Sequence, residues 1–214
     1  MKCAALVLTF VGAALLCSCA NPERSRDLAN PAVSATTLAL QVCSDCHGFK
    51  GNAVSPNFPN LAGQTPAYLA AQLRGFKSHD RQDPAGFEYM WGLSRSLTNG
   101  QIDALAIYYA SQQPEQQPIE GNLSRMPAGM SIFEGGLPAQ NVPACSACHG
   151  NQGQGTDAAP RIAGQHVDYI VKQLIVFQRT DERPAGAAMK AVAHELRADD
   201  IASVAAYAQS LSGR

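Results

Sequence analysis

Apolar and polar positions follow a helical period in the middle of each half of the chain. Residues at positions i, i+4, i+5 and i+8 of a segment lie on one face of a helix. In the first half that face is formed by Tyr68, Gln72, Leu73 and Phe76, and the same residue types recur at Tyr169, Gln173, Leu174 and Phe177. No segment shows the alternation that is typical of strands. The pattern therefore predicts an all-α fold.

The sequence also marks where several helices begin. Thr98-Asn99-Gly100-Gln101 has the form of a capping box, which predicts the start of the last helix of the first half. Asp199 and Asp200 favour the start of the corresponding helix in the second half, because acidic side chains stabilise a helix N-terminus. Residues 38–43 predict a further helix in the first half.

The first twenty residues differ from the rest of the chain. Lys2 is followed by an uncharged, mostly apolar run of 16 residues, 4–19, whereas a membrane-spanning helix needs about 20. Residues 1–20 therefore predict an export signal, with a buried N-terminal helix as the alternative. Two processing routes stay open: cleavage after Ala20, or a lipoprotein-type signal with acylation of Cys19.

The remainder is a tandem repeat. Pro59-Asn60-Leu61-Ala62-Gly63-Gln64 matches Pro160-Arg161-Ile162-Ala163-Gly164-Gln165, and the offset between matching positions drifts only from 102 to 99. The repeat predicts two copies of one domain, at residues 35–113 and 127–214. Residues 114–126 between them begin with a polar, proline-punctuated stretch and are the predicted linker.

Composition narrows the choice of partners. A net charge of -1 and a pI near 6.5 argue against nucleic acid, and they offer no charged patch that would steer a partner. Of the seven cysteines, three lie within the predicted export signal. If that signal is removed after Ala20, the remaining four all belong to the motif described next.

The pentapeptide Cys-x-x-Cys-His occurs twice, at 43–47 and 145–149. This is the attachment signature of a c-type haem, in which two thiols add to the haem vinyl groups and the next histidine ligates the iron. It assigns four thiols as haem attachment points, Cys43, Cys46, Cys145 and Cys148. It also assigns one proximal iron ligand to each copy, His47 and His149.

Cys-x-x-Cys pairs also form redox disulfides and halves of zinc sites. A four-cysteine zinc site would bring its pairs closer in sequence, typically about 15–20 residues apart. A thioredoxin-like disulfide would need a βαβ pattern, which the chain lacks. Two covalently bound haem c groups are therefore the favoured interpretation.

The sixth iron ligand must come from elsewhere, and the repeat helps to choose it. Met90 follows the first histidine by 43 residues and Met189 follows the second by 40, at matching places in the two copies. The remaining histidines and the methionines upstream of the second motif do not recur: His79, His166, His194, Met126 and Met130. We therefore expect Met90 and Met189 to be the distal ligands, since Met/His ligation is common in c-type cytochromes.

Pro59 and Pro160 follow the motif histidines by 12 and 11 residues. Their carbonyl groups could accept the imidazole N–H and so fix the tautomer of each proximal histidine. The alternative is that these prolines only shape a loop.

These features together resemble the dihaem cytochrome c4 family over essentially the whole mature length. The resemblance implies two cytochrome c-like domains related by pseudo-twofold symmetry, each built around one covalently attached haem. It further implies an electron carrier of the periplasm, often membrane-bound, that transfers electrons toward terminal oxidases. The resemblance also favours the proline carbonyl contact to the proximal histidine. The loop at 135–143 has no equivalent in the first copy, so the two haem environments should differ.

The expected function is electron transfer between respiratory complexes, from a quinol–cytochrome c oxidoreductase toward a terminal oxidase, rather than catalysis. One alternative is a haem enzyme, such as a dihaem peroxidase or an oxidoreductase acting on sulfur compounds, which needs one open iron. A second is the cytochrome subunit of a dehydrogenase, which differs only in its partner. The expected location is the periplasm, with the protein either free or anchored through a lipidated Cys19.

Overall fold

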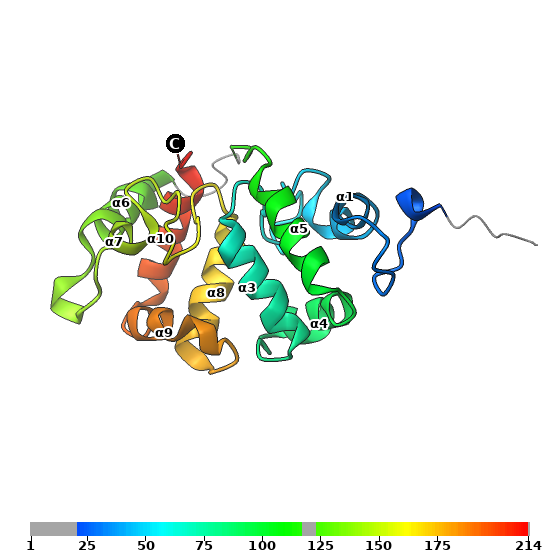
Figure 1. Ribbon diagram of the computed structural model, residues 1–214. Coiled ribbons are helices and arrows are strands. Elements are labelled where there is room, and N and C mark those ends of the chain that lie inside the picture. The colour runs from blue at the N-terminus through cyan, green and yellow to red at the C-terminus, as the bar shows by residue number, and fades with distance from the viewer. Residues whose placement is uncertain (1–20, 117–122, 214) are drawn as a thin grey trace, which may run out of the picture.

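The chain is helical in the computed structural model, which describes residues 21–116 and 123–213. Within these ranges no strand forms, and the one pairing of extended residues is an isolated antiparallel bridge between Leu137 and Val142. The predicted all-α fold is confirmed (Figure 1). The predicted export signal at 1–20, with Cys19, lies outside the described residues.

In the first half, one helical run begins at Ala35 and continues to His47 through the first Cys-x-x-Cys-His motif, with a π-helical turn in its middle. The long helix predicted from the period of apolar residues follows it. The elements of this half are η1 (Pro22–Arg24), α1 (Ala35–Leu38), η2 (Ala39–Cys43), α2 (Ser44–His47), α3 (Pro66–Lys77), η3 (Gly86–Met90), α4 (Trp91–Ser94) and α5 (Asn99–Ala110).

The second half repeats the order of the longer helices but differs in the segments that connect them. Its first long helix ends at Gly135, and a loop separates that helix from the short helix that carries the second motif. The loop contains the segment that the sequence marks as additional. The elements are η4 (Leu123–Arg125), α6 (Met126–Gly135), η5 (Pro138–Gln140), α7 (Ser146–His149), α8 (Val167–Arg179), η6 (Pro184–Gly186), α9 (Ala187–Ala193) and α10 (Ala198–Ser210).

The predicted helix starts are confirmed. Gln101 N donates to Thr98 Oγ1 (3.1 Å) and Thr98 N donates to Gln101 Oε1 (3.0 Å), which completes the capping box of α5. Asp199 and Asp200 lie in the first turn of α10, and Asp200 accepts a hydrogen bond from the backbone N–H of Arg197 (3.0 Å). Local sequence thus fixes the beginning of the last helix in each half.

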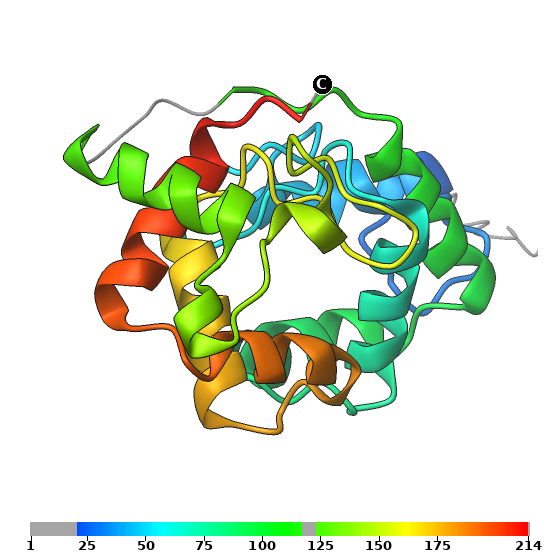
Figure 2. The same cartoon turned by 90° about the vertical axis from the view of Figure 1, so that its left-hand side faces the viewer.

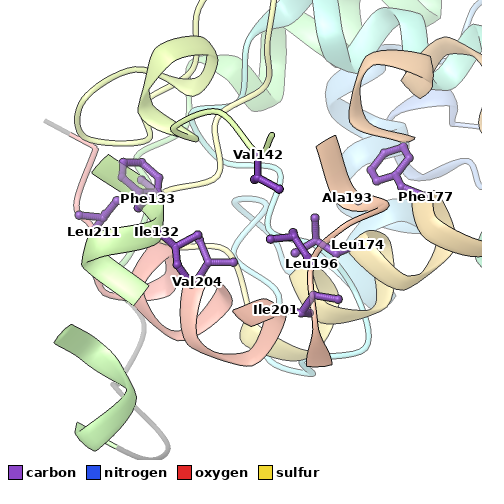
Figure 3. Close-up of a cluster of buried hydrophobic side chains, with 11 residues drawn as sticks. Ile132, Phe133, Val142, Leu174, Phe177, Ala193, Leu196, Ile201, Val204 and Leu211 are labelled. Atoms are coloured by element: carbon purple, nitrogen blue, oxygen red, sulfur yellow. The ribbon is translucent and has the colours of Figure 1, made fainter. Parts of the chain in front are cut away.

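Each half has its own hydrophobic core, and the two cores share no residue. The side chains of the second core come from α6, α8, α9, α10 and the loops beside them (Figure 3). They are Ile132, Phe133, Val142, Ala163, Leu174, Phe177, Ala193, Leu196, Ile201, Val204 and Leu211. The first core contains Val33, Leu38, Ala39, Leu69, Ala70, Leu97, Ile102, Leu105, Ala106 and Tyr109. Two separate cores are what two tandem domains require.

The first and last long helices of the second half cross closely at Gly129. A Cβ atom at this position of α6 would lie 2.1 Å from the backbone oxygen of Ser203 in α10. Beside the crossing, the rings of Phe133 and Tyr207 pack with their centroids 5.4 Å apart. In the first half, helices α1 and α5 are also in contact.

The two halves meet along the middle of Figure 1, where α3 and α8 lie. Gln82 N donates to the Glu182 carbonyl across this boundary (2.8 Å). The start of the linker lies beside the end of the chain (Figure 2), and Gln116 Nε2 donates to the Ser210 carbonyl (3.0 Å). Among the described residues, no helix is long and apolar enough to cross a bilayer.

Candidate haem sites

Each Cys-x-x-Cys-His motif ends at the last residue of a short helix, and a glycine follows. His47 is the last residue of α2 and His149 is the last residue of α7. The following glycines, Gly48 and Gly150, have φ values of +74° and +84°, which side-chain-bearing residues rarely adopt. A Cβ atom at Gly48 would also lie 2.2 Å from the Asn52 carbonyl oxygen. Glycine therefore allows the chain to turn away directly after each histidine.

The two motif histidines make the same hydrogen bond. His47 Nδ1 lies 2.9 Å from the Pro59 carbonyl oxygen, and His149 Nδ1 lies 2.7 Å from the Pro160 carbonyl oxygen. A carbonyl can only accept, so Nδ1 carries the proton and Nε2 keeps a free lone pair. The expected proline contact is thus confirmed in both halves. It leaves each Nε2 in the form that ligates a metal ion.

The surroundings of both motifs favour uncharged side chains. Burial lowers the pKa of His47 and of His149 below the usual histidine value, and the hydrogen bonds to the proline carbonyls oppose this only in part. Burial also raises the pKa of the Cys43 and Cys145 thiols to about 11. Neutral imidazoles in an apolar setting suit a largely apolar cofactor.

The two methionines that recur in the repeat occupy equivalent places. Met90 is the last residue of η3 and Met189 lies in α9, so each precedes the last helix of its half. Both are half-buried, and Met189 packs against the second hydrophobic core. The structure therefore agrees with the sequence that they are counterparts.

The three other histidines lie in unrelated surroundings. His166 Nε2 donates to the Ala53 carbonyl of the other half (2.9 Å). His194 is exposed on the surface. His79 has a φ of 65° and packs beside Trp91, with 5.0 Å between the ring centroids. None of them has a histidine at the matching position of the other half.

The donor set of each motif fits a covalently attached haem. All four motif cysteines carry unpaired thiols, and the adjacent imidazole offers a free Nε2. Within residues 21–116 and 123–213, no three His, Cys, Asp or Glu side chains gather as a metal site would require. Thiols and imidazole would hold the haem, which supplies an iron that changes oxidation state.

A buried polar network, which the sequence did not reveal, joins the two halves. Arg81 binds Asp83 through two hydrogen bonds, Nε to Oδ1 (2.6 Å) and Nη2 to Oδ2 (3.2 Å). Arg81 also donates to Gln72 of its own half (2.6 Å) and to Gln173 of the other half (3.3 Å). Arg183 donates to the same two glutamines. The recurrence of glutamine at one place in both repeated helices was the available signal.

Each half matches the same known family. Residues 32–113 and residues 129–212 both match cytochrome c. The two matches together cover more than half of the chain and include both Cys-x-x-Cys-His motifs. The matched ranges contain both hydrophobic cores and both motif histidines.

Relatives of similar length narrow the family further. Cytochrome c4 of Azotobacter vinelandii is 35% identical over 179 residues, covering 79% of this chain and 84% of that protein. The thiosulfate dehydrogenase electron acceptor of Stutzerimonas stutzeri is 31% identical over 183 residues, covering 84% of this chain and 80% of that protein. The crystal structure of reduced cytochrome c4 from Pseudomonas stutzeri matches with a TM-score of 0.73 at 32% identity, over 83% of this chain and 97% of that one. The chain therefore belongs to the cytochrome c family as a dihaem cytochrome c4, an electron-transfer protein with two covalently bound haem c groups.

Proposed function

We propose that this protein carries electrons in the periplasm between respiratory complexes and delivers them toward a terminal oxidase. The haems are attached through Cys43 and Cys46 in the domain at 35–113, and through Cys145 and Cys148 in the domain at 127–214. The observation that carries the proposal is the pair of equivalent histidine–proline contacts, His47–Pro59 and His149–Pro160. Each contact holds a neutral imidazole with its Nε2 available to the iron, at matching positions of the two domains.

Met90 and Met189 supply the sixth ligands in this proposal. Their equivalent places before the last helix of each domain support the assignment. With His and Met on both irons no position stays open for a substrate, so the chain would move electrons rather than catalyse a reaction. A thioether ligand stabilises the ferrous state and gives potentials in the positive range.

The donor in this scheme is a quinol–cytochrome c oxidoreductase and the acceptor is a terminal oxidase. Periplasmic location follows from the predicted export signal at 1–20. Acylation of Cys19 would anchor the protein to the membrane, whereas cleavage after Ala20 would release it. Mass spectrometry of the N-terminal peptide separates the two, because acylation leaves Cys19 as the modified first residue.

A second candidate function is the acceptance of electrons from a dehydrogenase. It is favoured by one observation, the 31% identity to a thiosulfate dehydrogenase electron acceptor over 84% of this chain. The two candidates differ in the donor. Stopped-flow mixing of the oxidised protein with a purified thiosulfate dehydrogenase and with a quinol–cytochrome c oxidoreductase would show which one reduces it faster.

Three measurements test the core of the proposal. Denaturing mass spectrometry should give the mass of the mature chain plus two haems, and extraction of haem by acidified acetone would contradict covalent attachment. Oxidised protein should show the weak near-infrared absorption of Met–Fe(III). Met90→Ala and Met189→Ala should each remove roughly half of that band, and a band that survives either change would exclude that methionine as a ligand.

The two haems should have unequal potentials. The residues beside the methionines differ between the domains, with Tyr89 and Trp91 in the first matched by Ala188 and Lys190 in the second. Polarity and burial around a haem tune its potential. A redox titration should therefore require two one-electron components. A single component would contradict the inequality.

A further inference from the structure

The peptide groups that follow Pro59 and Pro160 are each hydrogen-bonded through both the C=O and the N–H. The amide that joins Pro59 to Asn60 accepts from His47 Nδ1 through its carbonyl oxygen (2.9 Å). Its N–H group donates to Gln165 Oε1 (2.8 Å), a side chain of the other domain. One planar amide thus lies between the proximal histidine of the first domain and a glutamine of the second.

The second domain contains the equivalent arrangement, with the roles of the two domains exchanged. The amide that joins Pro160 to Arg161 accepts from His149 Nδ1 (2.7 Å). Its N–H group donates to Gln64 Oε1 of the first domain (2.8 Å). The contacts therefore cross, because the glutamine of each domain binds the peptide that holds the proximal histidine of the other.

Both glutamines are fixed in place by further hydrogen bonds. Gln165 Nε2 donates to the Asn60 carbonyl (3.0 Å), and its Oε1 also accepts from His166 N (3.1 Å). Gln64 makes the same pair of bonds, with the Arg161 carbonyl (2.9 Å) and with Thr65 N (2.9 Å). Gln64 and Gln165 are only 6% and 8% exposed, so bulk water has little access to these contacts.

Hydrogen bonds in a chain strengthen one another, because each bond polarises the group that makes the next one. An amide whose N–H is bound by a glutamine oxygen carries more negative charge on its carbonyl oxygen. That oxygen then accepts more strongly from the imidazole Nδ1–H. A stronger hydrogen bond at Nδ1 makes the ring a better electron donor to the metal ion. Better donation stabilises the ferric state and lowers the reduction potential.

From this geometry we infer that Gln64 and Gln165 are positioning residues that tune the haem of the opposite domain through the proline peptide. Gln165 lowers the potential of the haem held by His47, and Gln64 lowers that of the haem held by His149. The inference rests on the proposed ligation of the irons by these two histidines. It assigns a role to the last residue of the repeated Pro-x-[Leu/Ile]-Ala-Gly-Gln segment.

The test uses the full-length, haem-loaded protein with Gln165→Leu, Gln64→Leu and selective ¹⁵N labelling of histidine. In the reduced, diamagnetic state, the Nδ1–H resonance of each ring reports the strength of its own hydrogen bond. Gln165→Leu should move the His47 signal upfield and leave the His149 signal in place. It should also raise the potential of the first haem, changing its ratio of reduced to oxidised form about threefold at fixed ambient potential, or about 28 mV. Gln64→Leu should do the reverse.

Two further variants keep the result interpretable. Gln165→Glu retains an acceptor for the Asn60 N–H, so the His47 signal should stay downfield. His166→Leu removes a different bond between the domains, to the Ala53 carbonyl (2.9 Å), and should leave both potentials unchanged. Equal shifts at both haems in Gln165→Leu, or an equally large effect of His166→Leu, would overturn the inference in favour of general loosening of the interface.

Failure of the ligation itself would look different. A histidine bound to a reduced haem has its ring-carbon protons displaced far upfield by the ring current. Wild-type protein that lacks this displacement for His47 or His149 would contradict the proposed ligand set. Wild-type protein that shows it, with variants that move neither Nδ1–H signal, would contradict the tuning role alone.

Discussion

The ion pair between Arg81 and Asp83 should contribute strongly to stability, and Asp83→Asn is the change that tests this. The side chains are 8% and 0% exposed and share two hydrogen bonds. Removing one partner of a buried pair leaves an uncompensated charge, at a cost of about 3–5 kcal/mol. Arg81 would keep its bonds to Gln72 and Gln173, so it could not easily turn toward water.

A matched control is available on the surface of the same domain. Arg74 and Asp103 form an ion pair whose side chains are 46% and 53% exposed. Exposed pairs contribute about 0–1 kcal/mol, so Asp103→Asn removes the same charge at little cost. The two variants should therefore differ by about 3 kcal/mol in the free energy of unfolding.

Thermal unfolding followed by circular dichroism measures this difference at one pH. A loss of about 3 kcal/mol lowers the melting temperature by about 12–24 °C for a domain of 60–100 residues, or by about 6–12 °C when 150–250 residues unfold together. The size of the shift thus also reports whether the domains unfold separately. Replacing both Arg81 and Asp83 by apolar residues should recover part of the loss. Equal melting temperatures for Asp83→Asn and Asp103→Asn would refute the reasoning.

Three other predictions concern packing, pH and ligand access. Gly129→Ala should destabilise the second domain by about 1–3 kcal/mol, since its Cβ would meet the Ser203 backbone, whereas Gly135→Ala in the same helix meets nothing within 4 Å and should be neutral or stabilising in urea melts. Because burial lowers the pKa of His47 and His149, the unfolded chain protonates first on acidification; these two side chains should leave the free energy of unfolding unchanged above about pH 6.5 and lower it below that pH, and a rise on acidification would contradict this. Reduced protein should bind carbon monoxide poorly if both irons are six-coordinate, and rapid stoichiometric binding at one haem would favour an enzyme.

The sequence predicted those features that depend on residues close together in one copy or on the comparison of the two copies. Helix α3 follows from the spacing of its apolar residues, and α5 from the capping box at Thr98. The repeat placed Met90 and Met189 as counterparts, and it pointed to both proline carbonyls. In these cases the interacting groups lie within one copy, so a single pattern or the comparison of two copies is sufficient.

For the contacts between the domains, the sequence holds only the recurrence of glutamine at matching places of the two copies. Arg81 and Asp83 are matched in the second copy by Asp181 and Arg183, so the charges are exchanged and the segment looks like a solvated loop. Gln64 could be identified as a recurring residue, but its partner, Arg161, lies 97 positions away in the other copy. A side chain at an interface binds whichever backbone group the docking of the two folded domains brings near it. No periodicity in the sequence encodes that docking.

The crossed glutamine contacts also have a consequence for how such a chain is assembled. Gln64 binds Arg161 and Gln165 binds Asn60, which is the matching position of the other copy. Reciprocal pairing of this kind is what a twofold axis produces in a homodimer, where the same patch serves both subunits. Each domain carries both parts of the contact, the glutamine side chain and the peptide group that a glutamine binds. Two copies of one such domain would therefore already have complementary surfaces. The linker then joins two partners whose surfaces already fit, and cutting it after folding should leave the halves associated.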